Sequence, residues 1–510
     1  MAFTRRSLLG WLRAPVVVAL VAVLTAGVGL GLLAGADHGT SRRHVVVDGV
    51  PLDEVHPAGV PAGERRPGVV VAHGFAGSAK LMAPFADTLA ARGYVVVLLD
   101  FSGHGANTNP LPAGAASTDV SSMPLQRDLD VALTHLRGLS DVDPSRVALV
   151  GHSMGATEVT RYALAHPEVT ATVAISLPDS SFVPPDRPAR LLLLAGGLEF
   201  PGFRAAAEDA AEDGSTGRSA VIVPRVEHIS ILYAPRTHRE VVRWLDDSFG
   251  GPIVVGSMPW PLRRPGAAGL LLLALAAGLY PAARLVLGGG PSRWPRIAVP
   301  WPQYGHIVAV ASVAAVVGVL VAPIAPTIRL PLALGGFIVG FTLAAGAVMV
   351  GYDHWLGRRS SASTPDDHPG GLRLAVATPV LIGYAAVTIA VPLQLGVTHA
   401  VPNGARWWLL AFAWAGFAVL AYGAEQVASG NSLGVLAVSA VATIALTCAA
   451  VVGLTSSFLV LVVPLVAALL LWQAIWSAVL HRFAAPRWLI SLVGSLVVAW
   501  PLATALPVIR

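Results

Sequence analysis

The residues most able to do chemistry in this chain are Gly151-His152-Ser153-Met154-Gly155, where a serine lies between two glycines. The apolar run Arg146 to Val150 precedes them, and the helix-compatible stretch Ala156 to Ala165 follows. A strand, a sharp turn and a helix in this order expose the serine at the turn, and the glycines allow the two backbones to approach closely. The pattern therefore predicts that Ser153 is a nucleophile.

A serine hydroxyl needs a neighbouring base, usually histidine, and a carboxylate that orients this base. Glu199 follows the strand predicted from Arg190 to Ala195, and His228 follows the strand predicted from Ala220 to Val223. The order of nucleophile, acid and histidine is the one expected for such a turn on a parallel sheet. Ser153, Glu199 and His228 are therefore the predicted catalytic residues.

The elements that must position these residues alternate between short strand-like runs and amphipathic helical segments, from about His44 to Gly250. This alternation predicts an α/β fold with a doubly wound, mostly parallel sheet that helices cover on both faces. An edge hairpin is expected through Asp48-Gly49. The other expected strands are Gly68 to Ala72, Tyr94 to Asp100, Arg146 to Val150, Thr170 to Ile175, Arg190 to Ala195 and Ala220 to Val223. The expected helices are Lys80 to Arg92, Leu125 to Leu139, Ala156 to Ala165, Phe203 to Glu212 and Pro235 to Phe249.

Three further motifs strengthen this interpretation. Val69 to Phe75 is similar to the strand and HGx motif that place one oxyanion-hole amide in serine hydrolases, and Val226 to His228 is similar to the loop of a catalytic histidine. Leu99 to Gly105 resembles the DxxGHG turn of the monoacylglycerol-lipase and S33-like branch. Residues 44–250 thus resemble an α/β-hydrolase domain, the superfamily of esterases, lipases, acyltransferases and S33-type serine peptidases.

The resemblance implies a role for each site residue. Ser153 is the nucleophile, His228 the base and then the acid, and Glu199 the orienting carboxylate, while the backbone amides of Phe75 and Met154 form the oxyanion hole. Most members of the superfamily have aspartate where this chain has glutamate. Some place the acid after an earlier strand, where this chain has Asp179, so Asp179 is the alternative to Glu199.

Other polar side chains near these motifs are expected to be structural. His104 should close a turn, His152 should pack sideways, and Glu227 and Asp246 should be solvated surface charges. No group of His, Cys, Asp and Glu has metal-ligand spacing, and no GxGxxG follows a strand, so no metal or other cofactor is expected. The interval Ser176 to Pro188 is too short and too rich in proline for a helical lid, which predicts an open site.

The composition of the chain indicates a membrane protein. Of 510 residues, 55% are hydrophobic and 12% are charged, against about a quarter charged in soluble proteins. The mean hydropathy is +0.67. The net charge of +5 comes with scattered arginines, which cytoplasmic loops explain better than a nucleic-acid partner. The expected partners are membrane lipids and a small-molecule or lipid ester, and no nucleic acid.

The domain organisation follows from the apolar runs. Residues 1–13 are a cytoplasmic N-terminus, 14–34 a transmembrane anchor or uncleaved signal, 44–250 the hydrolase domain, 251–265 a Pro-rich linker and 266–510 an eight-helix transmembrane domain. A cleaved signal ending near Ala34-Gly35-Ala36 is the alternative for the first apolar segment. The eight later spans are expected at Gly266 to Leu287, His306 to Pro326, Pro331 to Tyr352, Leu374 to Leu395, Trp407 to Tyr422, Leu433 to Leu454, Phe458 to Leu480 and Trp488 to Val508.

The distribution of arginines favours one orientation in the membrane. The loops opposite the hydrolase hold most of them, namely Arg284, Arg293, Arg296, Arg358, Arg359, Arg373, Arg482 and Arg487, whereas the other loops hold Arg329 and Arg406. Arg263 and Arg264 beside the hydrolase are the exception, although segments next to a long translocated domain count for less in this rule. Because cytoplasmic loops are enriched in arginine, we expect nine spans, a cytoplasmic N-terminus and an extracytoplasmic hydrolase domain and C-terminus. The expected location is the cell membrane, with multiple passes.

The sequence as a whole predicts a membrane-anchored serine hydrolase that cleaves carboxylic esters through an acyl-enzyme. A serine peptidase or an acyltransferase on the same triad is an alternative, because the shape of the pocket sets the leaving group and the acceptor. A transporter or lipid-binding protein with a non-catalytic hydrolase-like domain is another. The intact serine and histidine motifs and the near absence of charge inside the spans disfavour it.

Overall fold

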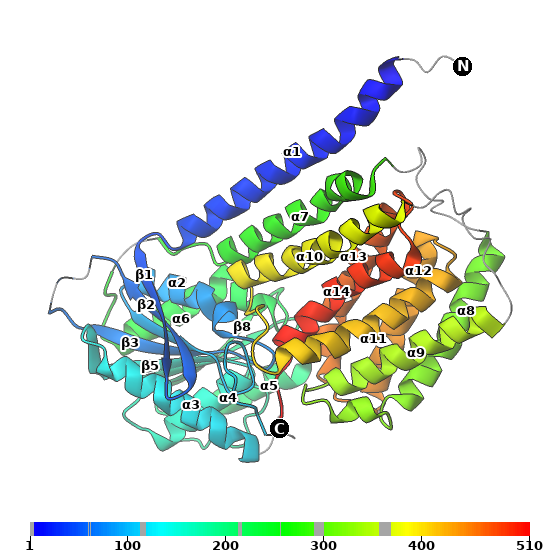
Figure 1. Cartoon of the computed structure of the whole chain (residues 1–510). Helices are drawn as coiled ribbons and strands as arrows, with labels where there is room; N and C mark the ends of the chain where they lie inside the picture. The colour runs from blue at the N-terminus through cyan, green and yellow to red at the C-terminus, as the bar shows by residue number, and fades with distance from the viewer. Residues whose placement is uncertain are drawn as a thin grey trace. The chain divides into compact units, whose positions relative to one another are not determined.

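The computed structural model describes residues 5–59, 61, 63–112, 119–212, 217–254, 257–289, 300–355 and 369–510. The chain forms two compact units, whose elements Figure 1 labels. The sheet unit comprises Val28–Gly269, Leu393–Val401 and Pro507–Arg510. The helical unit comprises Met1–Gly27, Leu270–Pro392 and Pro402–Leu506.

The sheet has eight strands in the order β1-β2-β4-β3-β5-β6-β7-β8. β1 pairs antiparallel with β2 and β2 with β4, while every other neighbouring pair is parallel. Asp48 and Gly49 join β1 to β2 with positive φ angles of 47° and 79°, as a tight hairpin requires. The predicted α/β class is confirmed. The strands are β1 (Thr40–Val47), β2 (Val50–Pro57), β3 (Arg66–Ala72), β4 (Val95–Leu99), β5 (Val142–His152), β6 (Ala171–Ile175), β7 (Leu191–Gly196) and β8 (Arg218–Val223).

Helices cover both faces of this sheet because successive side chains of each strand point to opposite sides. Val69 and Val71 of β3 pack in one cluster with α2 (Ala83–Ala91) and α6 (Pro235–Ser248), whereas Val70 packs in the other with α3 (Asp119–Gly138) and α4 (Met154–Ala165). Figure 1 shows α2 and α3 on opposite sides of the strands. A third cluster packs α5 (Pro201–Glu212) against β6 and β7.

The described part of the chain contains nine helices that are long and apolar enough to cross a membrane. Their number agrees with the predicted nine spans and indicates a multi-pass membrane protein. Arg293, Arg296, Arg358 and Arg359, on which the predicted orientation partly depends, lie outside the described residues. The nine helices are α1 (Arg5–Ala36), α7 (Arg263–Leu287), α8 (Trp301–Val321), α9 (Gly335–Trp355), α10 (Gly371–Gly396), α11 (Arg406–Val427), α12 (Ser432–Val451), α13 (Leu459–His481) and α14 (Arg487–Ala505).

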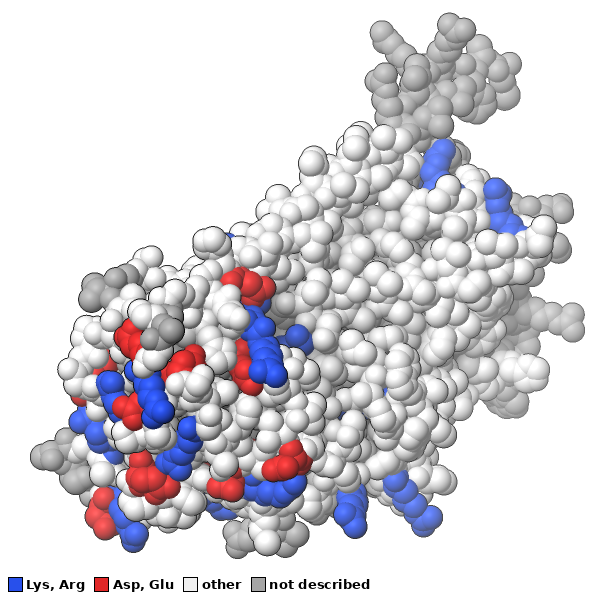
Figure 2. All heavy atoms as spheres, turned by 60° about the vertical axis from the view of Figure 1, so that its left-hand side comes forward, with Lys and Arg blue, Asp and Glu red and all other residues white. Residues whose placement is uncertain are grey.

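The two units differ in surface charge. On the face drawn in Figure 2, the charged side chains gather on the sheet unit, with acidic and basic groups intermixed, and few lie on the helical unit.

The environment of Asp246 differs from the sequence prediction. Asp246 is buried, with 8% of its surface exposed, and accepts hydrogen bonds from the Tyr94 hydroxyl at 2.6 Å and from Arg92 Nη2 at 3.0 Å. The expectation that Asp246 is a solvated surface charge is wrong, because α6 turns this residue toward the strands.

The sheet unit is not one continuous stretch of sequence, unlike the predicted hydrolase domain at 44–250. It includes residues 393–401, which are the last turn of α10 and the start of its connection to α11, and residues 507–510 after α14. The Val508 amide donates to the Gly103 carbonyl at 2.8 Å, and the Leu111 amide donates to the Val508 carbonyl at 2.9 Å. These backbone hydrogen bonds attach the last residues of the chain to the 103–111 turn region of the sheet unit.

Candidate active site

Ser153 lies at the turn between β5 and α4, with φ 54° and ψ −116°. Few residues other than glycine adopt a positive φ, so the surrounding contacts must hold the serine there. A Cβ on Gly151 would lie 2.2 Å from the Gly155 carbonyl oxygen, and a Cβ on Gly155 would lie 2.6 Å from the Ala72 carbonyl oxygen. Strand and helix backbones therefore approach so closely that both positions require glycine.

The structure brings Ser153, His228 and Glu199 together into one chain of contacts. His228 Nε2 lies 3.1 Å from Ser153 Oγ, and His228 Nδ1 lies 2.6 Å from Glu199 Oε1. Glu199 and His228 are each only 5% exposed. Because they follow β7 and β8, which are parallel neighbours, both reach the carboxyl edge of the sheet where β5 delivers the serine. The arrangement can pass a proton from the serine to the imidazole.

The Glu199 carboxylate has a second donor. The Gly196 amide donates to Glu199 Oε2 at 2.6 Å, so one oxygen is fixed by the backbone while the other faces the imidazole. Glycine at 196 is itself required, because a Cβ there would lie 2.5 Å from the Val226 carbonyl oxygen. The loops after β7 and β8 are thus packed tightly enough to fix the carboxylate.

Asp179, the alternative acid, lies elsewhere. Its side chain is exposed and accepts hydrogen bonds from the Ser181 amide at 2.9 Å and from the Ser181 hydroxyl at 2.7 Å. These bonds, chiefly the one from the Ser181 amide, lower the pKa of Asp179. Its carboxylate caps a local turn, and its geometry gives it no part in the contacts of His228.

The loop after β3, residues 73–79, passes beside Ser153, and we call it the oxyanion loop because it carries Phe75, whose amide is predicted to belong to the oxyanion hole. A Cβ on Gly74 would lie 3.0 Å from Ser153 Cβ, so the backbone that leads into Phe75 runs against the serine. Met154 is the first residue of α4, where an amide has no partner within the helix and the helix dipole is positive. The predicted amides of Phe75 and Met154 therefore belong to segments on two sides of Ser153.

His73 fixes the oxyanion loop from inside. Its Nδ1–H donates to the Gly74 carbonyl at 2.7 Å, and its Nε2 accepts from the Phe101 amide at 3.1 Å. Burial lowers the pKa of His73 to about 4, so the ring is neutral at pH 7. His104 is also fully buried, with its ring 5.1 Å from that of His73 and its Nδ1 3.0 Å from the Ser102 carbonyl oxygen. His104 therefore has the structural environment that the sequence predicted.

Asp100 connects the oxyanion loop to the neighbouring turn. It is 5% exposed and accepts hydrogen bonds from the Ala79 amide at 2.7 Å and from the Ala106 amide at 2.8 Å. A Cβ on Gly105, whose φ is +52°, would lie 2.3 Å from the carboxyl carbon. Burial raises the pKa of Asp100. Asp100 thus joins the two loops, a role that was not predicted from the motif in the sequence.

Exposed apolar side chains lie on the two loops that carry Glu199 and His228. Leu198 and Phe200, 67% and 53% exposed, flank Glu199, and Ile229, 43% exposed, follows His228. The Phe203 ring lies 4.8 Å from that of His228. We call these four residues the apolar rim. The apolar rim was not predicted from the sequence, although the apolar residues on both sides of Glu199 are a signal that could have indicated it.

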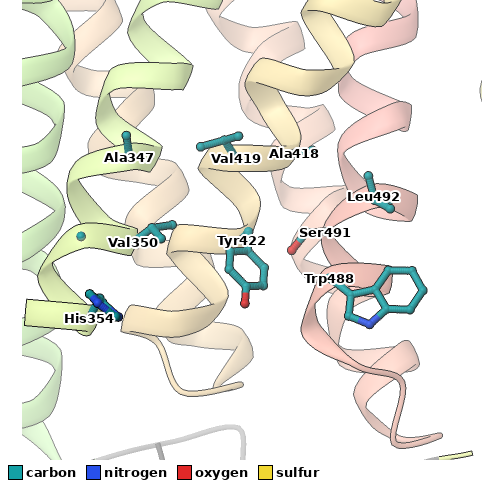
Figure 3. Close-up of a pocket in the computed structure, with 10 residues that line it drawn as sticks. Ala347, Val350, His354, Ala418, Val419, Tyr422, Trp488, Ser491 and Leu492 are labelled. Carbon is teal, nitrogen blue, oxygen red and sulfur yellow. The ribbon is translucent and has the colours of Figure 1, made fainter. Parts of the chain in front are cut away.

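The helical unit has a cavity of its own, of about 650 Å³. Figure 3 shows side chains of α9, α11 and α14 around it, with His354, Tyr422, Ser491 and Trp488 toward one end. The remaining lining is aliphatic or glycine: Ala347, Val350, Gly351, Ala418, Val419 and Leu492. An apolar chain with a polar end would fit such a lining.

Within the described part of the chain, no group of three or more His, Cys, Asp or Glu could hold a metal ion.

Part of the chain is similar to known proteins. Residues 63–205 match the family described as serine aminopeptidase, S33. Uncharacterized proteins from two strains of Mycobacterium tuberculosis are 35% identical over 107 residues, which is 21% of this chain and 34% of theirs. The match thus spans about a third of the length of these curated relatives.

The solved structures that are similar to about two-fifths of the chain include the following three. A dienelactone hydrolase from Anabaena variabilis is 22% identical, with 42% of this chain and 98% of that chain covered and a TM-score of 0.33. Est1E from Butyrivibrio proteoclasticus is 14% identical, with 41% and 99% covered and a TM-score of 0.33. An esterase from Pyrococcus furiosus is 17% identical, with 42% and 94% covered and a TM-score of 0.32.

Proposed function

Because the chain carries an α/β-hydrolase domain, we propose that it is a membrane-anchored serine hydrolase that cleaves carboxylic esters through an acyl-enzyme. The observation that carries this proposal is the contact series of Glu199, His228 and Ser153, with distances of 2.6 Å and 3.1 Å. Serine, histidine and a carboxylate in this geometry supply a nucleophile, its base and the group that orients the base.

The proposed reaction begins when His228 Nε2 takes the proton of Ser153 and Ser153 Oγ attacks the ester carbonyl carbon. The carbonyl oxygen becomes an oxyanion, which the amides of Phe75 and Met154 stabilise. The carbon–oxygen bond to the alcohol then breaks, and the alcohol leaves with the proton from His228. Water repeats the sequence on the acyl-serine and releases the acid, while the negative charge of Glu199 stabilises the imidazolium in both steps.

The apolar rim supports an ester with an apolar acyl or alcohol part. Exposed apolar side chains on both catalytic loops give such a group a surface to bury, and each fully buried aliphatic side chain contributes about 1.5–3 kcal/mol. A serine peptidase or an acyltransferase would use the same triad, and the matched S33 description includes peptidases. A parallel assay of p-nitrophenyl esters and aminoacyl-p-nitroanilides would separate ester from peptide hydrolysis.

The proposed orientation places the sheet unit outside the cytoplasm. Among described residues, seven arginines lie at helix ends that the nine-span order puts on the side opposite the sheet unit, and four lie at helix ends on its own side. The seven are Arg5, Arg6, Arg13, Arg284, Arg373, Arg482 and Arg487, and the four are Arg263, Arg264, Arg329 and Arg406. Residues 393–401 and 507–510, which belong to the sheet unit, lie at or just beyond helix ends that the same order puts on the side of the sheet unit. Excess arginine marks the cytoplasmic side.

Labelling of membranes with a fluorophosphonate probe tests the proposal without knowledge of the substrate. Wild-type protein should be labelled, and Ser153→Ala should abolish labelling while the protein remains in the membrane fraction. Thr157→Ala, on the first turn of the same helix, is the matched control and should still be labelled. Persistent labelling of Ser153→Ala would show that another residue is the nucleophile.

The cavity of the helical unit favours lipid binding as a second function. Its aliphatic lining and its polar residues at one end suit a membrane lipid. Ala418→Trp should fill the cavity and reduce photocrosslinking by a diazirine-bearing lipid. Unchanged crosslinking would refute this second function and leave the hydrolase proposal intact.

A further inference from the structure

The oxyanion loop is held by a segment far away in the sequence. The segment Leu393–Val401, which comprises the last turn of α10 and the start of the connection to α11, belongs to the same compact unit as the catalytic residues, and we call it the connection. The His399 amide donates to Ser78 Oγ at 3.1 Å, and Thr398 Oγ1 lies 2.9 Å from the same oxygen. Because the amide is a donor only, the Ser78 hydroxyl can give its own proton to Thr398. Ser78 is 1% exposed, so these contacts satisfy a buried hydroxyl.

Ser78 is an anchor of the turn that carries Phe75. The Gly77 amide donates to the Gly74 carbonyl at 3.0 Å, which closes a tight turn around Phe75 and Ala76. Ala76 has a φ of 58°, a conformation that neighbouring contacts must maintain in a residue with a side chain. A shift at Ser78 would therefore move the amide that we assign to the oxyanion hole.

Asp100 holds the next attachment point of the oxyanion loop. The Ala79 amide donates to this buried carboxylate at 2.7 Å. Asp100 in turn holds the Ala106 amide. The oxyanion loop thus has two consecutive attachment points, Ser78 on the Thr398-His399 pair and Ala79 on Asp100.

The connection is itself well ordered by internal bonds. The amides of Val397 and Thr398 both donate to the Leu393 carbonyl at 2.9 Å, and the Ala400 amide donates to Gln394 Oε1 at 2.7 Å. A Cβ on Gly396 would lie 2.5 Å from the Arg264 carbonyl oxygen, so the turn packs closely against the start of α7. A rigid turn can hold the Thr398 hydroxyl in one place.

We propose that Thr398 is a positioning residue of the hydrolase, which acts through Ser78 to hold the Phe75 amide where the oxyanion forms. This inference rests on the proposed function. It makes a connection between two membrane spans part of the catalytic machinery, so that full turnover requires the helical part of the sequence as well as the α/β domain. Misplacement of an oxyanion donor affects the transition state more than the bound substrate.

The test uses the full-length protein in detergent with a short-chain p-nitrophenyl ester. Thr398→Val removes the hydroxyl at nearly constant volume and should lower kcat by about 3- to 30-fold, with KM changed less than about twofold. Thr398→Ser keeps the hydroxyl and should restore most of kcat. Val401→Ala, at a side chain 47% exposed on the same connection, is the matched control and should leave kcat unchanged.

Two further measurements separate positioning from folding. Titration with a fluorophosphonate counts competent sites, so kcat is expressed per competent site. An alkyl boronic acid forms a tetrahedral adduct with the serine, and its affinity should weaken in Thr398→Val by about the same factor as kcat/KM falls.

Three results would overturn the inference. They are a Thr398→Val protein with wild-type kcat per site, a loss explained wholly by fewer competent sites, and an equal loss in Val401→Ala. Labelling that persists in Ser153→Ala would instead refute the proposed function. If Ser153→Ala abolishes labelling and Thr398→Val is unaffected, only the positioning role fails.

Discussion

Replacement of Glu199 by glutamine tests the assignment of the acid most directly. The carboxylate accepts two hydrogen bonds, from the Gly196 amide at 2.6 Å and from His228 Nδ1 at 2.6 Å. A glutamine has one carbonyl oxygen and one NH₂ group, so it can accept only one of these bonds. Its NH₂ group must face either the backbone donor or the imidazole.

The size of the effect follows from these two orientations. If the NH₂ group donates to Nδ1, His228 carries its proton on Nε2 and cannot take the proton of Ser153, a defect that costs up to about 10⁴-fold in turnover. If the NH₂ group faces Gly196 instead, a buried donor is left unsatisfied at about 1–3 kcal/mol, and the imidazolium still loses its counter-charge. We therefore expect Glu199→Gln to lower kcat by at least about a hundredfold.

Asp179→Asn should lower kcat by less than about tenfold, because the carboxylate is exposed and bonded to Ser181. Glu199→Asp keeps the charge on a shorter side chain and should retain part of the activity. The assay is hydrolysis of a short-chain ester, with competent sites counted by a fluorophosphonate. A small loss of kcat in Glu199→Gln together with a large loss in Asp179→Asn would refute the assignment of the acid, although the serine hydrolase proposal would survive.

Three other predictions concern orientation, folding and pH. A reporter fused after Gly250 should lie outside the cytoplasm and one within residues 353–373 inside it, and a protease-protection assay that finds both on one side would contradict the nine-span order. Gly155→Ala should prevent folding of the elbow, because its Cβ would lie 2.6 Å from the backbone oxygens of Ala72 and His73, whereas Gly202→Ala, with no atom within 4 Å, should leave the amount of folded protein unchanged. Burial lowers the pKa of His73 and His238 to about 4 from an ordinary 6.5, so the folded state binds fewer protons than the unfolded state between these values. The free energy of unfolding should then fall as the pH drops from about 6.5 toward 4. The accompanying loss in the midpoint temperature of unfolding should be smaller in His238→Gln than in the wild-type protein. An equal loss in both proteins would show that His238 does not titrate in this way.

The sequence alone determined the features that depend on neighbours along the chain. The strand, glycine-flanked serine and helix around Ser153 follow from hydrophobic periodicity and from the need for glycine where backbones touch. The nine membrane-length helices follow from uninterrupted apolar runs, which are local in the same sense. The chain order of Ser153, Glu199 and His228 was also readable, because parallel strands deliver their following loops to one edge of the sheet.

Only the tertiary structure decided which distant groups meet. Glu199 and Asp179 both follow strands of the same sheet, and the distances to His228 and Ser181 distinguish them. Asp246 was predicted to be solvated because the charge of a residue does not show how deeply it is buried. Its contact with Tyr94 depends on how α6 packs. The contact between Ser78 and Thr398 joins residues 320 positions apart. Neither propensity nor periodicity encodes such a contact, because it depends on the packing of elements that are far apart in the chain and meet only in the folded protein.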